Sequence, residues 1–207
     1  MKFVELSWEV YGTIDVDYGY PLYSAICHRL ERHLHEAGAP WSMSPVMIYE
    51  GGADDGRLRV ESGEIMVRCM ADLVPDFADI YAPSGLRIRE SGSLHMVRCA
   101  PTVRTLRPSR CLRASRVTIK AAAAGTSCLE RHVFEERLVA QLAGRIGRLR
   151  GLRTGPAFSI RVGQQVSHGY AVELDGLSPE DSLALQVRGV GGRLRMGCGF
   201  FLAEALC

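Results

Sequence analysis

Residues 2–11, KFVELSWEVY, set the first element of the fold because their side chains alternate between two faces. A period of two residues predicts a half-buried strand. A helix is expected next, entered at Gly19-Tyr20-Pro21 and stopped by Gly38 and Pro40. The positions that predict this helix recur every three or four residues: Leu22, Tyr23, Ile26, Leu30, His33 and Leu34.

The remaining runs of the first half complete one supersecondary pattern. Apolar or alternating runs at 43–49 and 57–69 predict strands, and a short helix is expected at 70–79. Two further runs, 84–90 and 93–100, are each bounded by Gly or Pro. The resulting order, β-α-β-β-α-β, is that of a ferredoxin-like domain.

The second half repeats this order, so the sequence predicts an α+β fold of tandem ferredoxin-like (RRM-like) domains, 1–103 and 104–207. No sequence repeat relates the halves, and the tandem prediction rests on element order alone. The second set of predicted elements is a strand at 112–120, a helix at 126–149, a strand pair at 157–162 and 166–175, a helix at 178–188 and a closing strand at 196–202.

The composition favours a soluble, cytoplasmic protein without a membrane partner. The 207 residues are 47% hydrophobic, but no run of 18 apolar residues occurs and the first ten mix charges with apolar residues. Seven cysteines, none at C-x-x-C spacing, argue against a disulfide framework and a zinc finger. We therefore expect reduced, mostly buried thiols, no metal site and no cofactor.

The basic residues gather in the middle of the chain. Residues 1–103 hold 9 basic and 15 acidic side chains, residues 104–153 hold 12 and 3, and residues 154–207 hold 4 and 5. All basic residues except Lys2 and Lys120 are arginine, whose planar guanidinium suits phosphate contacts. The clustering indicates a polyanionic partner, although a GC-rich genome would explain the arginine preference equally well.

Residues 189–201, GVGGRLRMGCGFF, combine five glycines with two arginines. Glycine lets backbone amides approach a phosphate, and the guanidinium groups would neutralise it. The segment matches neither a P-loop nor a dinucleotide fingerprint. The alternative is a purely structural hairpin packed beneath Phe200 and Phe201.

This glycine-rich segment resembles the C-terminal loop of the CRISPR-associated endoribonucleases that process repeat RNA, the sixth Cas family, and especially of its small myxobacterial-type branch. Three further segments resemble the same branch: DYGYPLYSA at 17–25, RASRVTIK at 113–120 and LSPEDSL at 177–183. The resemblance implies two ferredoxin-like domains that bind a CRISPR repeat hairpin and cut precursor RNA at its 3′ base without metal. It also implies that the protein stays bound to the 3′ handle of the guide RNA, beside other subunits of an effector complex.

RNA cleavage without metal uses the 2′-OH of the substrate as nucleophile, with a general base, a general acid and a cation for the phosphorane. The resemblance places the catalytic histidine near the first helix, where His28, His33 and His35 occur. His35, in the HLHE segment, is the first candidate and His33 the second, while an ordinary surface histidine remains the alternative for each.

Other candidates accompany these histidines. Lys120 would stabilise the phosphorane or anchor a phosphate, and Tyr23, with Tyr20 beside it, would orient the substrate or pack in the core. His168 ranks lower because a hairpin turn is expected there. The predicted RNA-binding residues are Arg104, Arg107, Arg110, Arg113, Arg116, Gly191, Gly192, Arg193, Arg195, Gly197 and Gly199.

The five arginines at 104–116 recur every third residue, which fits neither one helix face nor one strand face. Some would contact an RNA backbone and others would pair with the acidic first half. Two competing functions stay open: a non-catalytic hairpin-binding subunit of an effector complex, and a ferredoxin-like protein whose glycine loop holds a small nucleotide.

Overall fold

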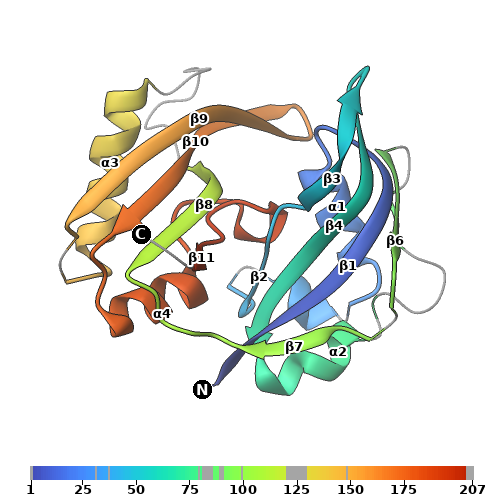
Figure 1. Ribbon diagram of the computed structural model, residues 1–207, viewed down its shortest axis with the longest axis horizontal. Coiled ribbons are helices and arrows are strands. Elements are labelled where there is room, and N and C mark those ends of the chain that lie inside the picture. The colour runs from blue at the N-terminus through green and yellow to red at the C-terminus, as the bar shows by residue number, and fades with distance from the viewer. Residues whose placement is uncertain are drawn as a thin grey trace. The chain divides into compact units, whose positions relative to one another are not determined.

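The computed structural model describes residues 2–30, 32–36, 38–78, 80, 86–88, 91–98, 100–119, 130–147 and 149–203, without the side chains of Arg32 and His33. The chain divides into two compact units, Met1–Thr105 and Leu106–Cys207. Each unit has its own sheet (Figure 1). Each also has its own apolar core.

The first sheet is built around β1 (Phe3–Asp15), the strand that the opening alternation predicts. One edge of β1 pairs antiparallel with β4 (Arg57–Met70) over nearly its whole length. Its other edge pairs with β6 (Gly92–Met96) near one end and with β7 (Thr102–Thr105) near the other. β6 and β7 therefore share the position of a single strand.

The outer strands of this sheet are shorter. β2 (Trp41–Met43) and β3 (Met47–Asp54) both pair with the free edge of β4, and β5 (Leu86–Arg87) borders β6. The sheet order is β2-β4-β1-β6-β5, so β2 and β5 lie at opposite edges.

Helices α1 (Gly19–Cys27) and α2 (Val74–Ala78) cover the apolar face of this sheet, and a 3₁₀ helix, η2 (Ala71–Leu73), precedes α2. Their apolar side chains share one core with the strands. The members of this core with no exposed surface include Leu6, Ile14, Leu22, Ile26, Met43, Ile65 and Phe77.

The first helix is shorter than predicted. It ends at Cys27, and the chain continues through a turn into a second 3₁₀ helix, η1 (Arg32–His35). Leu30 and Leu34, which helped to predict a longer helix, are nevertheless buried. The spacing of apolar residues therefore predicted correctly that Leu30 and Leu34 are buried. It was wrong about the backbone conformation, which is a turn and a 3₁₀ helix and not a continued α-helix.

The second sheet is antiparallel and has the order β11-β8-β10-β9. Its inner strands are β8 (Cys111–Thr118) and β10 (Gln165–Asp175), and its outer strands are β9 (Gly151–Val162) and β11 (Leu202–Ala203). The predicted pair 157–162 and 166–175 is correct in place, but β9 begins six residues earlier. The closing strand predicted at 196–202 is wrong for most of its length.

Two helices cover one face of the second sheet. In α3 (Arg131–Ala143) the residues Phe134, Leu138 and Leu142 enter the core, and in α4 (Pro179–Arg188) Leu185 does so. The Ser178 side chain caps α4 by accepting from the amide of Asp181 at 3.1 Å, as the sequence predicts. The helix predicted at 126–149 is shorter, and its first residues lie outside the described part of the chain.

Both units follow the strand order fourth, first, third, second of a β-α-β-β-α-β chain. In the first unit, β2 and β3 together take the second position and β6 takes the fourth. The predicted α+β fold of tandem ferredoxin-like domains is therefore confirmed.

The cysteines agree only in part with the expectation of reduced thiols. Cys27, Cys69 and Cys198 are free and buried. Cys111 is disulfide-bonded, so the expectation is wrong there. No helix in the described part of the chain is both long enough and apolar enough to cross a membrane.

One ion pair is buried in the first unit. Arg68 on β4 is 1% exposed, and its Nη2 and Nε lie 2.8 and 2.9 Å from Oε2 of Glu5 on β1. Burial lowers the pKa of Arg68, whereas the Glu5 carboxylate raises it. Glu5 therefore compensates a charge that burial would otherwise make costly.

We predict that Glu5→Leu destabilises the protein by roughly 3–5 kcal/mol, because it leaves the Arg68 charge buried without its carboxylate. The double variant Glu5→Leu/Arg68→Met removes both charges and should recover most of the loss. Urea unfolding measures both. Asp15→Asn, which breaks the exposed pair of Asp15 with Arg57 at 3.6 Å, is the control and should cost less than about 1 kcal/mol. Equal losses for Glu5→Leu and Asp15→Asn would contradict the interpretation.

Candidate functional site

The glycine-rich segment folds back onto the end of β8. The Gly192 amide donates to Thr118 O at 2.9 Å, and the Gly199 amide donates to Arg116 O at 2.6 Å. The Thr118 hydroxyl in turn donates to Gly192 O at 3.0 Å. We call residues 189–199 the glycine turn.

Two glycines of the glycine turn, Gly191 and Gly199, leave no room for a side chain. Gly191 has φ +84°, and a Cβ added there would overlap the carbonyl oxygen of Thr118. A Cβ at Gly199 would overlap Val190 O in the same way. The predicted role of these glycines, close backbone approach, is thus directed at β8 of the protein itself.

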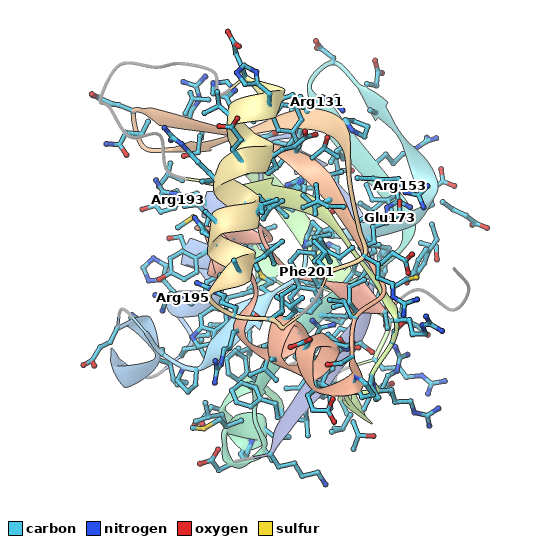
Figure 2. All side chains as sticks on the ribbon, turned by 90° about the vertical axis from the view of Figure 1, so that its left-hand side faces the viewer. Arg131, Arg153, Glu173, Arg193, Arg195 and Phe201 are labelled. Atoms are coloured by element: carbon cyan, nitrogen blue, oxygen red, sulfur yellow. The ribbon has the colours of Figure 1, made fainter. Side chains whose placement is uncertain are left out.

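Arginine side chains surround the turn. Arg193 has a left-handed backbone, φ +61°, which opens the 3₁₀ helix η5 (Leu194–Met196), and Arg195 lies within that helix. Arg145, just beyond α3, donates to Gly189 O at 2.7 Å and so fixes the start of the turn. Figure 2 shows Arg193 and Arg195 on one flank of the unit, away from the Arg153–Glu173 pair.

The buried thiol of Cys198 lies within the influence of two arginine charges. Burial raises the pKa of Cys198 to about 12, while the charges of Arg116 and Arg193 and a hydrogen bond with Thr118 act to lower it. Arg116 and Arg193 therefore lie near the same sulfur atom, although they are far apart in sequence. The thiol itself stays protonated at neutral pH and is not a nucleophile.

The five arginines at 104–116 do not form one row. Arg104 lies on β7 of the first unit, and its Nη1 is 3.4 Å from Glu64 Oε1. Arg107 and Arg110 are exposed in the segment before β8, and Arg113 and Arg116 lie on β8. Arg104 thus pairs with the acidic first half, which was one of the two expectations for this set.

Of the neighbouring basic residues, Arg131 is held by the protein itself. It donates from Nη1 to Thr154 O at 3.0 Å and lies over the Tyr170 ring at 5.2 Å. Arg116 similarly lies 6.0 Å from the Phe158 ring centroid. Lys120, the predicted phosphorane cation, lies outside the described residues.

The candidate histidines occupy different environments. His28 is the C-cap of α1, and His33 and His35 belong to η1, where the His33 side chain is not among those described. His168 lies within β10, not at a turn. His35 is exposed, and its Nε2 lies 3.1 Å from Leu30 O. Because a carbonyl oxygen only accepts, Nε2 carries the proton, and the basic lone pair of the neutral ring lies on Nδ1.

An aromatic series supports the turn that carries His35. Tyr23 stacks on Trp41 with a centroid distance of 6.0 Å, and Trp41 packs edge-on against Phe77. The buried Trp41 Nε1 donates to Leu34 O at 2.8 Å, immediately before His35. No local pattern in the sequence marks this role of Trp41, because it depends on a strand and a turn that meet only in the folded protein.

Among the described residues, no three His, Cys, Asp or Glu side chains form a group that could hold a metal ion. The predicted residues thus fall into two sets. Tyr20, Tyr23, His28, His33 and His35 lie around α1 and η1, and the glycine turn with Arg116, Arg193 and Arg195 lies on the second unit.

Comparison with known proteins gives a consistent family. A family model described as Cas6 Crispr matches residues 4–205. The CRISPR-associated endonuclease Cas6 of Myxococcus xanthus (strain DK1622) is 32% identical over 212 residues, covering 98% of this chain and 82% of that protein.

Solved structures share the fold at lower identity. The structure of a Cas6-related gene product from Pyrococcus furiosus is similar with a TM-score of 0.69 at 13% identity, covering 99% of this chain and 98% of that one. Thermus thermophilus Cse3, bound to an RNA representing a pre-cleavage complex, gives 0.54 at 15% identity, covering 95% and 98%.

We predict that Gly191→Ala and Gly192→Ala differ sharply although the residues are adjacent. Alanine at 191 adopts an unfavourable positive φ and clashes with Thr118 O, so we expect a loss of at least about 2 kcal/mol. At 192 an added Cβ meets only Thr118 Oγ1 at 3.6 Å, and the change should stay within about 0.5 kcal/mol. Chemical denaturation of both variants tests this. Equal stabilities would mean that the turn does not need its close approach to β8.

Proposed function

Because the chain belongs to the Cas6 family of CRISPR-associated proteins, we propose that it is a metal-independent endoribonuclease of CRISPR repeat RNA. It binds the repeat hairpin, cleaves precursor RNA at the 3′ base of that hairpin and stays bound to the 3′ handle of the mature guide. The match to the family over residues 4–205 carries the proposal. The names of the relatives, an endonuclease and an RNA-bound Cse3, agree with it.

The chemistry requires little from the protein because the substrate supplies the nucleophile. The 2′-OH upstream of the cut attacks the adjacent phosphate, and the 5′-oxygen of the next nucleotide leaves with a proton. The products are a 2′,3′-cyclic phosphate and a free 5′-hydroxyl. The protein must remove one proton, deliver one and stabilise the charge of the phosphorane.

His35 is the proposed general base or acid. Its Nε2 is occupied by Leu30 O, so Nδ1 exchanges the proton with the substrate. The hydrogen bond from Trp41 to Leu34 O holds the turn on which His35 lies, and Tyr23 stacks on Trp41. Tyr23 and Lys120 complete the proposed catalytic set, in substrate orientation and phosphorane stabilisation respectively.

The glycine turn is the proposed phosphate-binding element. Its peptide groups are fixed by β8, and Arg193 and Arg195 project from it while Arg116 lies beside it. Arg107, Arg110 and Arg113 are exposed and would contact the backbone of the stem. An A-form stem is read mainly through shape and phosphates, because its major groove is deep and narrow.

The proposed location is the cytoplasm, where repeat transcripts are processed, and the further proposed partners are other subunits of a CRISPR effector complex. A protein that retains the 3′ handle after cleavage would carry the guide into that complex. These assignments follow from the proposed reaction and depend on it.

We predict that a single 2′-deoxy substitution at the nucleotide upstream of the cut stops cleavage. Binding should change by no more than one hydrogen bond's contribution, on the order of 0.5–1.5 kcal/mol. The all-RNA substrate should be cut in excess EDTA, since its own 2′-OH replaces a metal-activated water. Gel analysis of the products and a competition assay measure both effects. Cleavage of the deoxy substrate at the same bond would refute the mechanism, and tight binding without cleavage of all-RNA substrate would favour a non-catalytic hairpin-binding subunit.

We predict that His35→Ala slows single-turnover cleavage by roughly 10²–10⁴-fold, the usual effect of losing a general acid or base, with little change in RNA affinity. His132→Ala, at an exposed histidine of α3, is the control, and His33→Ala tests the second candidate. If His33→Ala abolishes cleavage while His35→Ala does not, the catalytic role belongs to His33.

A further inference from the structure

A pocket of about 490 Å³ lies in the first unit between α1 and β5, and the proposed catalytic set does not use it. Its apolar lining residues include Pro21 and Leu86. Its polar lining residues come from α1, from the residues just after α1, from β5 and from the turn before β6: Tyr20, Ser24, His28, Arg29, Arg87 and Ser91.

The chemistry of this lining suits an anion with an attached ring. Two guanidinium groups and an imidazole face the same space as three hydroxyl groups, and no carboxylate is among the described lining residues. Arg29 donates from Nη1 to Ile80 O at 2.5 Å, which fixes the direction of its guanidinium. The Tyr20 ring is 40% exposed and offers a surface on which a base can stack.

The charge of the pocket contrasts with its surroundings. Residues 1–103 carry an excess of acidic side chains, 15 against 9 basic ones. A second hollow of this unit, at the tip of the β3–β4 hairpin, mixes Asp54 and Asp55 with Arg57 and Arg59. The described lining of the pocket between α1 and β5 is by contrast cationic, as binding of a phosphate requires.

The pocket borders the side of α1 that carries Tyr23, since the rings of Tyr20 and Tyr23 are 6.5 Å apart. Tyr23 faces Trp41 on β2, and the indole of Trp41 holds the turn of His35. Tyr20, Ser24 and His28 follow each other at four-residue spacing on another face of the helix, toward β5. The pocket therefore lies next to the His35 region, and Arg87 and Ser91 are the polar lining residues that lie away from α1.

We propose that this pocket binds one unpaired nucleotide of the substrate RNA, outside the hairpin. Arg87, with Arg29 and His28, contacts its phosphate, Tyr20 stacks on its base, and the hydroxyls of Ser24 and Ser91 reach its ribose. A base within an A-form stem is stacked and cannot enter a concave pocket, whereas an unpaired nucleotide can. This proposal rests on the proposed function, because it assumes an RNA substrate.

The experiment compares two uncleavable RNAs that share one repeat hairpin with a 2′-deoxy nucleotide at the cut. One RNA is the bare hairpin and the other carries unpaired nucleotides on both sides. We expect the wild-type protein to bind the flanked RNA more tightly. Arg87→Ala should weaken binding of the flanked RNA roughly tenfold, leave the bare hairpin unaffected, and reduce the salt slope by about 0.7.

Two further variants separate charge from structure. Arg87→Lys keeps the positive charge and should retain most of the affinity, while Arg57→Ala, an exposed arginine of the same unit outside the pocket, should change neither RNA. Thermal melting confirms that each variant is folded. If Arg87→Ala weakens binding of both RNAs equally, or of neither, the pocket does not bind an unpaired nucleotide. That result would leave the proposed function unaffected. A wild-type protein that binds neither RNA would overturn both.

Discussion

The backbone of the glycine turn reaches the end of β8 only because no Cβ stands between them. Gly191 approaches Thr118 O and the Gly199 amide donates to Arg116 O, so an inner strand of the sheet fixes both ends of the turn. The sheet and the helix-covered core behind it thereby determine where Arg193 lies. A side chain at 191 would act on the candidate phosphate-binding element by displacing its backbone, without removing any cation.

The sequence predicts a helix or strand correctly where the local residue pattern matches the side chains that are actually buried or capped. The alternation at 2–11 marks β1 because one face of that strand is in the core, and Ser178 marks α4 because its side chain caps the helix. The same reasoning overextended the first helix, since Leu30 and Leu34 are buried from a turn and a 3₁₀ helix. The spacing of apolar residues indicates which side chains are buried against the sheet. It does not distinguish an α-helix from a turn followed by a 3₁₀ helix, because both can bury the same side chains.

The candidate site was predictable to the extent that it is local in sequence. The glycine turn is one continuous segment, so its composition alone marked it as unusual. Two other features depend on tertiary packing between segments far apart in the chain. Trp41 supports η1 through a hydrogen bond, and Arg29 and Arg87 line the same pocket. The separation of Arg104 from Arg113 was equally hidden, because a regular spacing of three carries no information about where one unit ends.

Helix α1 links the two regions that the first unit offers to a substrate. Successive residues of an α-helix are rotated by about 100°, so Tyr23 and Ser24 point to different faces of α1 although they are adjacent. Tyr23 is joined through Trp41 to the turn of His35, and Ser24 lines the cationic pocket. The two proposed RNA contacts of the first unit therefore adjoin each other, because the Tyr20 ring of the pocket lies 6.5 Å from the ring of Tyr23. A change in the orientation of α1 would displace both contacts together, whereas a change at Arg87 on β5 would affect the pocket alone.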